Sequence, residues 1–210
     1  MINIVDNIDS TNTWLTEFNN DFFDSIISLQ QSKGYGRQGR FWESELGGLY
    51  YSVVLPYRKT LPIIIGVSAS DILSKHNIDI RIKWPNDLLV DGKKLGGILC
   101  QSQGENAIIG LGINVNNNPN LSESTNLSDL GCNIDKLNFI DSLSKRIAVI
   151  MKWKEKKIID KFLTYDCLIG TRVSWSDGKG RVEQISEEGH LAIRNANNEL
   201  VFLTEEVHLE

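Results

Sequence analysis

The spacing of apolar positions predicts a series of strands with two helices up to about residue 114. Residues 48–55 are rich in β-branched and aromatic side chains and end at Pro56, which predicts a buried strand. Residues 61–76 carry apolar side chains at helical spacing and predict a helix. Residues 80–114 predict an antiparallel meander, because Asp91-Gly92 is a strong signal for a two-residue hairpin turn. The remaining predictions here are strands over 2–8 and 25–29 and a helix that follows the capping residues 9–12 and runs to about Phe18.

A different pattern follows residue 115. Residues 115–136 predict a long polar connection, and residues 139–162 predict helix with a break near 153–156. From residue 168 the pattern becomes short strands with tight turns, over 172–175, 180–185, 190–194 and 200–203. The sequence therefore predicts an α+β protein with two domains, 1–167 and 168–210. The first has a central mixed or antiparallel sheet with helices packed on it, and the second is a small SH3-like β-barrel.

The composition excludes several classes of protein. The chain has 210 residues, a formal net charge of −5 and three widely spaced cysteines, which fit neither a disulfide framework nor a metal site. An acidic chain lacks the basic face that general DNA binding requires. No apolar run approaches the ~20 residues that span a bilayer, and no basic region precedes an apolar stretch at the N-terminus. We therefore expect a cytoplasmic protein that binds neither DNA nor a membrane.

A local cluster of positive charge stands out against this acidic background. Residues 33–42, which we call the Gly/Arg loop, read Lys-Gly-Tyr-Gly-Arg-Gln-Gly-Arg-Phe-Trp. Glycine lets a backbone approach a ligand closely, and the guanidinium fork suits phosphate or carboxylate. Short runs of this kind also occur as ordinary surface turns, so the loop alone leaves both interpretations open.

A second cluster lies around the predicted hairpin. Pro85 interrupts a strand, so Asn86 and Asp87 are expected at a kink rather than in a regular ladder. Lys94 opens the next strand, across the hairpin from that kink. Asp87 is therefore placed either to hold a divalent cation or to orient a lysine, whereas a solvated hairpin tip is the alternative for the lysines.

Taken together and in order, five short motifs resemble those of the biotin protein ligases, the biotin–[acetyl-CoA-carboxylase] ligases. They are Ser10-Thr11-Asn12, the stretch from Gln31 to Trp42, Lys83-Trp84-Pro85-Asn86-Asp87, Lys94-Leu95-Gly96-Gly97-Ile98-Leu99 and Gly110-Leu111-Gly112-Ile113-Asn114. The resemblance runs from about residue 2 to the C-terminus and is to the ligase-only type, without an N-terminal DNA-binding domain. One position departs from the family pattern, because Tyr35 stands where the loop usually carries an arginine.

The resemblance implies an ATP-dependent reaction in two steps. Biotin is first activated as biotinyl-5′-AMP, with Mg²⁺ present, and is then transferred to a lysine of a biotin carboxyl carrier domain. That domain belongs to acetyl-CoA carboxylase or to another biotin-dependent carboxylase. Members of the family are monomers or homodimers. The Gly/Arg loop is expected to be mobile without ligand and to become ordered on binding.

The resemblance also implies roles for individual residues. The expected catalytic cations are Lys94, Arg37 and Arg40. The expected biotin contacts are Ser10, Thr11, Asn12, Gln31, Gly34, Tyr35, Gly36, Arg37, Lys94 and Gly97. The expected ATP contacts are Arg37, Arg40, Trp42, Asn86, Asp87, Lys94 and Asn114, with Trp42 stacked on adenine and Asp87 holding Mg²⁺. Trp84 is expected to pack in the core.

Two alternatives to a biotin ligase stay open at this point. A lipoate ligase-like acyltransferase would use a similar architecture and similar chemistry, but the motifs around Asp87 and Lys94 favour biotin. A non-catalytic nucleotide- or RNA-binding module would use the Gly/Arg loop and the small barrel, but the net charge of −5 argues against it.

Overall fold

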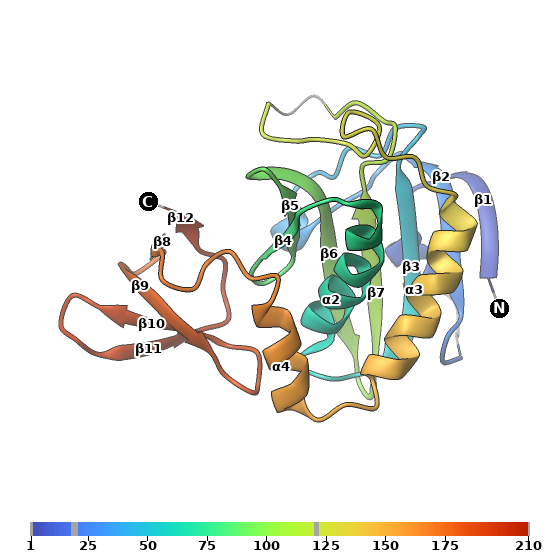
Figure 1. Cartoon of the computed structure of the whole chain (residues 1–210). Coiled ribbons are helices and arrows are strands. Elements are labelled where there is room, and N and C mark those ends of the chain that lie inside the picture. The colour runs from blue at the N-terminus through green and yellow to red at the C-terminus, as the bar shows by residue number, and fades with distance from the viewer. Residues whose placement is uncertain (1, 18–20, 120–121, 210) are drawn as a thin grey trace.

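The computed structural model describes residues 2–17, 21–119 and 122–209, and its main feature is a mixed β-sheet (Figure 1). The strands of this sheet follow the order β1-β2-β3-β7-β6-β5-β4. Only the pair β1 and β2 is parallel, and the other neighbours are antiparallel. The strands are β1 (Ile2–Ile8), β2 (Ser25–Gln31), β3 (Leu49–Pro56), β4 (Ile80–Lys83), β5 (Asp87–Val90), β6 (Lys93–Gln103) and β7 (Asn106–Ile113). The predicted mixed sheet and antiparallel meander are confirmed.

Helices cover the two faces of this sheet unequally. On one face lie α2 (Leu61–Leu73), α3 (Lys136–Ile150) and α4 (Glu155–Leu163), seen in front of the sheet in Figure 1. On the other face lies the short helix α1 (Thr11–Glu17), whose Leu15 packs on Ile26 and Val54. The predicted extension of this helix to Phe18 lies outside the described residues.

The alternation of side chains along the strands explains how both faces are filled. Val53 belongs to the large core beneath the three helices, whereas its neighbour Val54 belongs to the small core beneath α1. Helix α2 is buried on nearly every side, because it lies between the sheet and the helices α3 and α4. Each of its fully buried aliphatic side chains stabilises the fold by about 1.5–3 kcal/mol.

Turn chemistry fixes the hairpin that carries the second sequence cluster. Asp91 and Gly92 both have positive φ, 49° and 75°, as a type I′ turn requires. The predicted Asp-Gly hairpin is therefore confirmed. It sets β6 beside β5, so that Lys94 pairs with Leu89 and Gly97 pairs with Asp87.

Asparagine side chains at the start of the polar connection after β7 stabilise it by hydrogen bonds. The Asn114 side chain donates to the Thr125 carbonyl and accepts from Asn117. The backbone of Lys94 exchanges hydrogen bonds with this segment as well, donating to Glu123 and accepting from Thr125. The connection therefore crosses the start of β6 and becomes a wall beside Lys94.

The C-terminal strands form a second, antiparallel sheet in the order β11-β10-β9-β8-β12. They are β8 (Arg172–Trp175), β9 (Gly178–Ile185), β10 (Leu191–Asn195), β11 (Leu200–Leu203) and β12 (His208–Leu209). Among the described residues no pairing joins β11 to β12, so this sheet is open and the predicted closed SH3-like barrel is not confirmed. Strand β12 was not predicted, because two residues are too few to give a periodic signal.

The two sheets share one hydrophobic core. Leu168 and Val182 are fully or almost fully buried and belong to the same cluster as Trp84 and α2. The predicted division into residues 1–167 and 168–210 stays a prediction. No helix in the described ranges combines the length and the apolar character needed to cross a membrane.

Candidate active site

A cavity of about 240 Å³ opens on the face of the sheet that carries α1. Its floor is made by β6 and β7, where Gly97 pairs directly with Gly112 and Leu99 pairs with Gly110. These glycines leave the sheet surface bare, so other side chains lie flat on it. A Cβ atom at Gly110 would come within 2.3 Å of Asn12 Oδ1, and one at Gly112 within 2.7 Å of the Trp42 indole. These glycines are therefore explained by the close approach of the Asn12 and Trp42 side chains.

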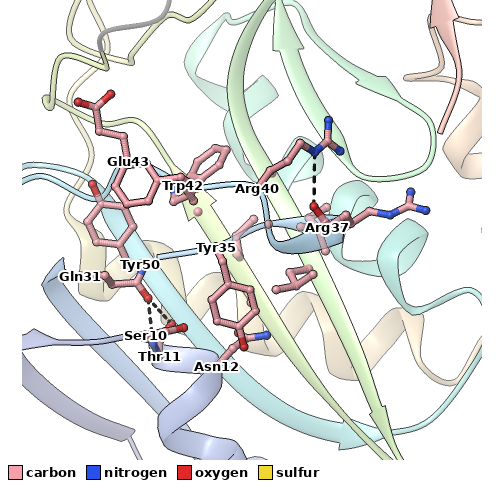
Figure 2. A pocket seen from close by; sticks show the side chains of 18 of the residues that line it. Ser10, Thr11, Asn12, Gln31, Tyr35, Arg37, Arg40, Trp42, Glu43 and Tyr50 are labelled. Carbon is pink, nitrogen blue, oxygen red and sulfur yellow. Dashed lines mark hydrogen bonds between the residues drawn. The ribbon is translucent and has the colours of Figure 1, made fainter. Parts of the chain in front are cut away.

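The inner end of the cavity is lined by neutral polar groups (Figure 2). Gln31, at the end of β2, accepts hydrogen bonds at Oε1 from the backbone N–H of Thr11, 2.8 Å, and from its hydroxyl, 3.0 Å. The Gln31 amide in turn donates to Ser44 Oγ, 2.8 Å away. Ser10 lies beside them at the start of α1 and is 4% exposed. Gln31, Thr11 and Ser10 offer donors and acceptors without charge, which suits a neutral polar ligand group, and the carboxylate of Glu43 lines the cavity beside Tyr50.

The Gly/Arg loop folds back over the cavity as a small hairpin. The Gly36 N–H donates to the Arg40 carbonyl, 2.7 Å, and the Trp42 N–H donates to the Gly34 carbonyl, 2.9 Å. Gly34 is required for space, because a Cβ there would lie 2.4 Å from Ser44 Oγ. This backbone arrangement places Tyr35 and Trp42 over the sheet and carries the arginines toward the outer end of the cavity (Figure 2).

Lys94 occupies the outer end, where β5 and β6 meet. Its Nζ forms an ion pair with Asp87 Oδ1 at 2.7 Å and lies 5.4 Å from the centre of the Trp42 ring. The Lys94 side chain is 34% exposed and that of Asp87 is 16% exposed. Of the two roles predicted for Asp87, orientation of a lysine is the one that these contacts favour.

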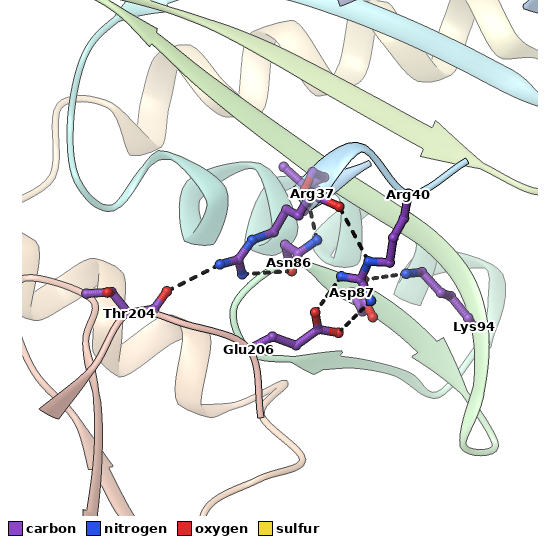
Figure 3. Close-up of polar contacts among 8 residues, drawn as sticks. Arg37, Arg40, Asn86, Asp87, Lys94, Thr204 and Glu206 are labelled. Carbon is purple, nitrogen blue, oxygen red and sulfur yellow. Dashed lines mark hydrogen bonds and ion pairs between the residues drawn. The ribbon is translucent and has the colours of Figure 1, made fainter. Parts of the chain in front are cut away.

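The two loop arginines contact the segment that connects β11 to β12 (Figure 3). Arg40 makes a bidentate ion pair with Glu206. Burial raises the pKa of the Glu206 carboxyl, but the hydrogen bond and the charge of Arg40, together with the charges of His208 and Lys83, outweigh burial, so the net pKa is lowered. Arg37 donates to the Thr204 carbonyl, 3.3 Å, and lies 3.5 Å from Asn86 Oδ1. Within the described part of the chain, Arg37 has no carboxylate partner, so its charge is the one most open to an anionic ligand.

The structure brings most of the predicted site residues to this one cavity. Those that line it are Ser10, Thr11, Asn12, Gln31, Tyr35, Gly36, Arg37, Arg40, Trp42, Asn86, Lys94, Gly97 and Asn114. Gly34 and Asp87 stand behind the lining and act through Ser44 and Lys94. Trp84 is 2% exposed and packs in the core, as predicted.

Two predicted residues have surroundings that the sequence did not indicate. Trp42 lies against Gly97 and Gly112, and its buried indole N–H has no hydrogen-bond partner among the described residues. Asn114 is 3% exposed. Its side-chain N–H and its side-chain oxygen both form hydrogen bonds within the polar connection. Their predicted roles toward ATP stay predictions.

Other residues of the site were missed by sequence reasoning. Ser44, Tyr50, Ser52, Gln101, Thr204 and Glu206 line the cavity or hold residues that do. Gln101 had a detectable signal, because it lies on the same face of β6 as Gly97 and Leu99 at a period of two. Glu206 had none, since 166 residues separate it from Arg40.

The donor set allows only a limited role in metal binding. No group of three or more metal-ligating side chains occurs in the described ranges. Asp87 is the carboxylate beside Lys94 and is already paired with it. Mg²⁺ binds through one or two carboxylates when a substrate's phosphates and water complete its shell. The residues therefore fit a Mg²⁺ ion that arrives with a nucleotide, but they form no cage of their own.

Comparisons with known proteins agree with this geometry. The chain belongs to the biotin/lipoate A/B protein ligase family, whose model matches residues 5–118. It is 40% identical over 108 residues to the bifunctional ligase/repressor BirA of Bacillus subtilis, covering 45% of this chain and 33% of that protein. It is 30% identical over 178 residues to the BirA protein of Escherichia coli, covering 75% of this chain and 55% of that one. The chain thus spans between a third and about half of these relatives.

A solved structure resembles the whole chain. The biotin protein ligase from Aquifex aeolicus in complex with biotin and ATP superimposes with a TM-score of 0.88 at 29% identity. The match covers 100% of this chain and 99% of that one. Both sheets and their connection are therefore shared with that ligase.

Proposed function

We propose that this chain is a biotin–protein ligase, which activates biotin with ATP and transfers it to a lysine of a biotin carboxyl carrier protein. The observation that carries the proposal is one cavity with two chemically different ends. A neutral end at Thr11 and Gln31 suits the ureido ring of biotin, which has both donors and an acceptor. A cationic end at Lys94, Arg37 and Arg40 suits a carboxylate that meets a polyphosphate.

The first step brings two anions together. A biotin carboxylate oxygen attacks the α-phosphorus of ATP, the bond to the β-phosphate oxygen breaks, and pyrophosphate leaves. We assign Lys94 the position between the two anions, and the contacts of its ammonium with Asp87 and with the Trp42 ring support this role. Positive charge that is already in position lowers the barrier, because it needs no reorganisation during the reaction.

The arginines of the loop complete the charge at the outer end. Of the three cations at this end, Arg37 has no carboxylate partner among the described residues. It can therefore bind a phosphate without breaking an ion pair. Arg40 must exchange Glu206 for phosphate, or share itself between them. Mg²⁺ would be held by Asp87 together with nucleotide phosphates and would supply further neutralisation of charge.

The second step transfers the acyl group. The neutral ε-amine of the carrier lysine attacks the acyl carbon of biotinyl-5′-AMP and forms an amide. The bond to the phosphate oxygen breaks, AMP leaves with the electron pair, and the amine loses a proton. The carrier domain of acetyl-CoA carboxylase or of another biotin-dependent carboxylase is the proposed partner, and the cytoplasm is the proposed location.

Biotin-dependent exchange of ³²P-pyrophosphate into ATP tests the first step directly. We expect exchange with biotin and none with lipoate, because the dithiolane ring of lipoate cannot pair with the polar groups at Thr11 and Gln31. Exchange with lipoate alone would assign the chain to the lipoate branch of the family. Absence of exchange with either acid, while the protein is folded, would contradict the proposal.

A further inference from the structure

A continuous set of neutral hydrogen bonds begins at the C-terminal end of the Gly/Arg loop. Ser44 Oγ donates to the carbonyl of Trp42 at 2.9 Å. The Gln31 amide donates to Ser44, and the backbone N–H of Thr11 donates to Gln31 Oε1, which leaves the Thr11 hydroxyl available to Ser52. This half of the set ties the end of the loop to the inner wall of the cavity.

The same set continues across the floor and returns to the loop at Tyr35. Ser52 Oγ lies 2.7 Å from Thr11 Oγ1 and 2.6 Å from Asn12 Oδ1. The Asn12 amide donates to Gln101 Oε1 at 2.7 Å. The Tyr35 hydroxyl donates to the same oxygen at 3.1 Å. The loop is thus connected at both ends to one network, which passes through the groups that would bind the ureido ring.

Tyr35 differs from the arginines in what it contacts. Its ring extends over Asn12 at the inner end of the cavity, as Figure 2 shows. Its hydroxyl contacts β6 through Gln101, and Thr13 Oγ1 of α1 lies 3.5 Å away. The arginines leave the loop on the opposite side and contact Thr204 and Glu206 of the C-terminal segment.

This difference determines which contacts persist during a reaction cycle. When phosphate arrives, Arg37 gains a phosphate partner and Arg40 exchanges Glu206 for phosphate or shares itself between the two, so the protein contacts of both arginines vary during the cycle. The hydrogen bond between Tyr35 and Gln101 joins two neutral groups. An arriving phosphate therefore does not displace it, and salt does not screen it. This hydrogen bond is therefore a contact able to keep the Tyr35 end of the loop in place, as the Ser44 bond does at the Trp42 end, while the contacts of the arginines vary.

We infer that Tyr35 is a positioning residue, whose hydroxyl bond to Gln101 holds the Gly/Arg loop over the cavity and slows the release of the bound acid. The identity of that acid as biotin rests on the proposed function. The bond acts on binding and retention, not on the reacting atoms, so it affects the bound substrate and the transition state equally.

The test compares Tyr35→Phe, which removes only the hydroxyl, with Tyr57→Phe, the same deletion on an exposed tyrosine. Hydrogen exchange is first measured on the protein without ligand. We expect backbone amides in residues 36–42 to exchange about fivefold faster in Tyr35→Phe, the ratio that corresponds to about 1 kcal/mol for one hydrogen bond. Amides of β7 should not change, which verifies that the variant is folded, and Tyr57→Phe should match the wild type.

Ligand kinetics provide a readout that a purely structural role would not move. Biotin should dissociate about fivefold faster from Tyr35→Phe with an unchanged association rate, and KM for biotin should rise while kcat stays within twofold. In a Gln101→Met background, which removes the acceptor, Tyr35→Phe should add nothing further. Unchanged loop exchange in Tyr35→Phe, or a full effect that persists in Gln101→Met, would overturn the inference. The exchange arm needs no ligand, so a protein that failed to bind biotin would contradict the proposed function and still leave the role of Tyr35 decided.

Discussion

Lys94 is the residue on which the proposed chemistry depends most. We predict that Lys94→Ala lowers biotin-dependent pyrophosphate exchange by about 10²–10³, because it removes a fixed charge from the point where two anions meet. The fold should persist, since the side chain is a third exposed and lies on a cavity wall. Lys93→Ala, an exposed lysine of the same hairpin, is the matched control and should keep its activity. Exchange by Lys94→Ala within a few-fold of the wild type would remove Lys94 from this role.

Arg37 offers a second test at the level of one side chain. Its guanidinium has only neutral acceptors among the described residues, so its charge is available to the phosphate of the proposed adenylate. We predict that Arg37→Gly weakens retention of biotinyl-5′-AMP by about 1–3 kcal/mol, the range for a charge-assisted hydrogen bond. The reactive intermediate should then escape and biotinylate a bystander protein that has no carrier domain.

The control for this experiment lies in the same loop. Lys33 is 76% exposed and pairs with Asp9 away from the cavity, so Lys33→Gly should not increase bystander labelling. Labelling is measured by streptavidin blot after incubation with biotin and ATP. Equal labelling by Arg37→Gly and the wild type, with exchange activity still present, would mean that other residues retain the adenylate.

At the level of elements, one carboxylate joins the three helices on the covered face of the sheet. Asp71 of α2 accepts from Arg146 of α3, from Lys161 of α4 and from Tyr165, at 2.5–2.9 Å. The Asp71 side chain is 13% exposed. Burial raises its carboxyl pKa, but the hydrogen bonds from Tyr165, Lys161 and Arg146 outweigh burial, so the net pKa is lowered. This cluster orders α4, the helix that precedes the C-terminal sheet.

We predict that Asp71→Asn lowers the free energy of unfolding by about 1.5–3 kcal/mol at neutral pH, the range for hydrogen bonds to a charged group. A lowered folded-state pKa means that the stabilisation is fully present above the ordinary aspartate pKa and is lost as the pH falls through the folded-state value. The wild type should therefore lose stability more steeply than Asp71→Asn below about pH 4. Urea unfolding at several pH values measures this. Asp141→Asn is the control, because the ion pair of Asp141 with Lys145 is exposed, and it should lower the free energy of unfolding much less. Parallel plots of unfolding free energy against pH for the wild type and Asp71→Asn would contradict the prediction.

At the level of the whole molecule, the site depends on how the C-terminal sheet is seated. Trp84 is buried in the shared core, and its indole N–H donates to the Gly189 carbonyl in the turn between β9 and β10, 2.9 Å away. Lys59 pairs with Glu188 in the same turn. These contacts keep the sheet in the position from which Thr204 and Glu206 meet the loop arginines.

We predict that Trp84→Phe loosens this seating, because it deletes the donor to Gly189 and leaves a small cavity. The free energy of unfolding should fall by about 1–3 kcal/mol. Backbone amides of residues 186–191 should exchange hydrogen faster than the lower free energy of unfolding alone explains. Amides at the centre of β7 should exchange faster only by the factor that this lower free energy predicts. Trp175→Phe, a half-buried tryptophan within the C-terminal sheet, serves as the comparison. Uniform acceleration over the whole chain would show that Trp84 contributes to the core without a particular role in seating the sheet.

Local signals were sufficient for the elements and for most of the site residues. The Asp91-Gly92 turn, the strand ending at Pro56 and a helix over 139–162 with a break near 153–156 were each predicted from a few neighbouring residues, and the structure has two helices, α3 and α4, with the break at 151–154. These features follow from backbone preferences and side-chain periodicity, which act over short stretches of chain. The resemblance of five ordered motifs then grouped residues that the structure places around one cavity.

The sequence by itself determined the residue types that meet in this site: glycines that bare a sheet, neutral amides and hydroxyls, and three cations. Only the tertiary structure decided their partners, because those partners lie up to 167 residues away and share no local pattern. In the folded chain Asp87 forms an ion pair with Lys94 and Glu206 forms one with Arg40. The Tyr35 hydroxyl donates a hydrogen bond to Gln101. The tertiary structure also left the C-terminal sheet open, because closure depends on whether its edge strands meet, and no local propensity encodes that distance.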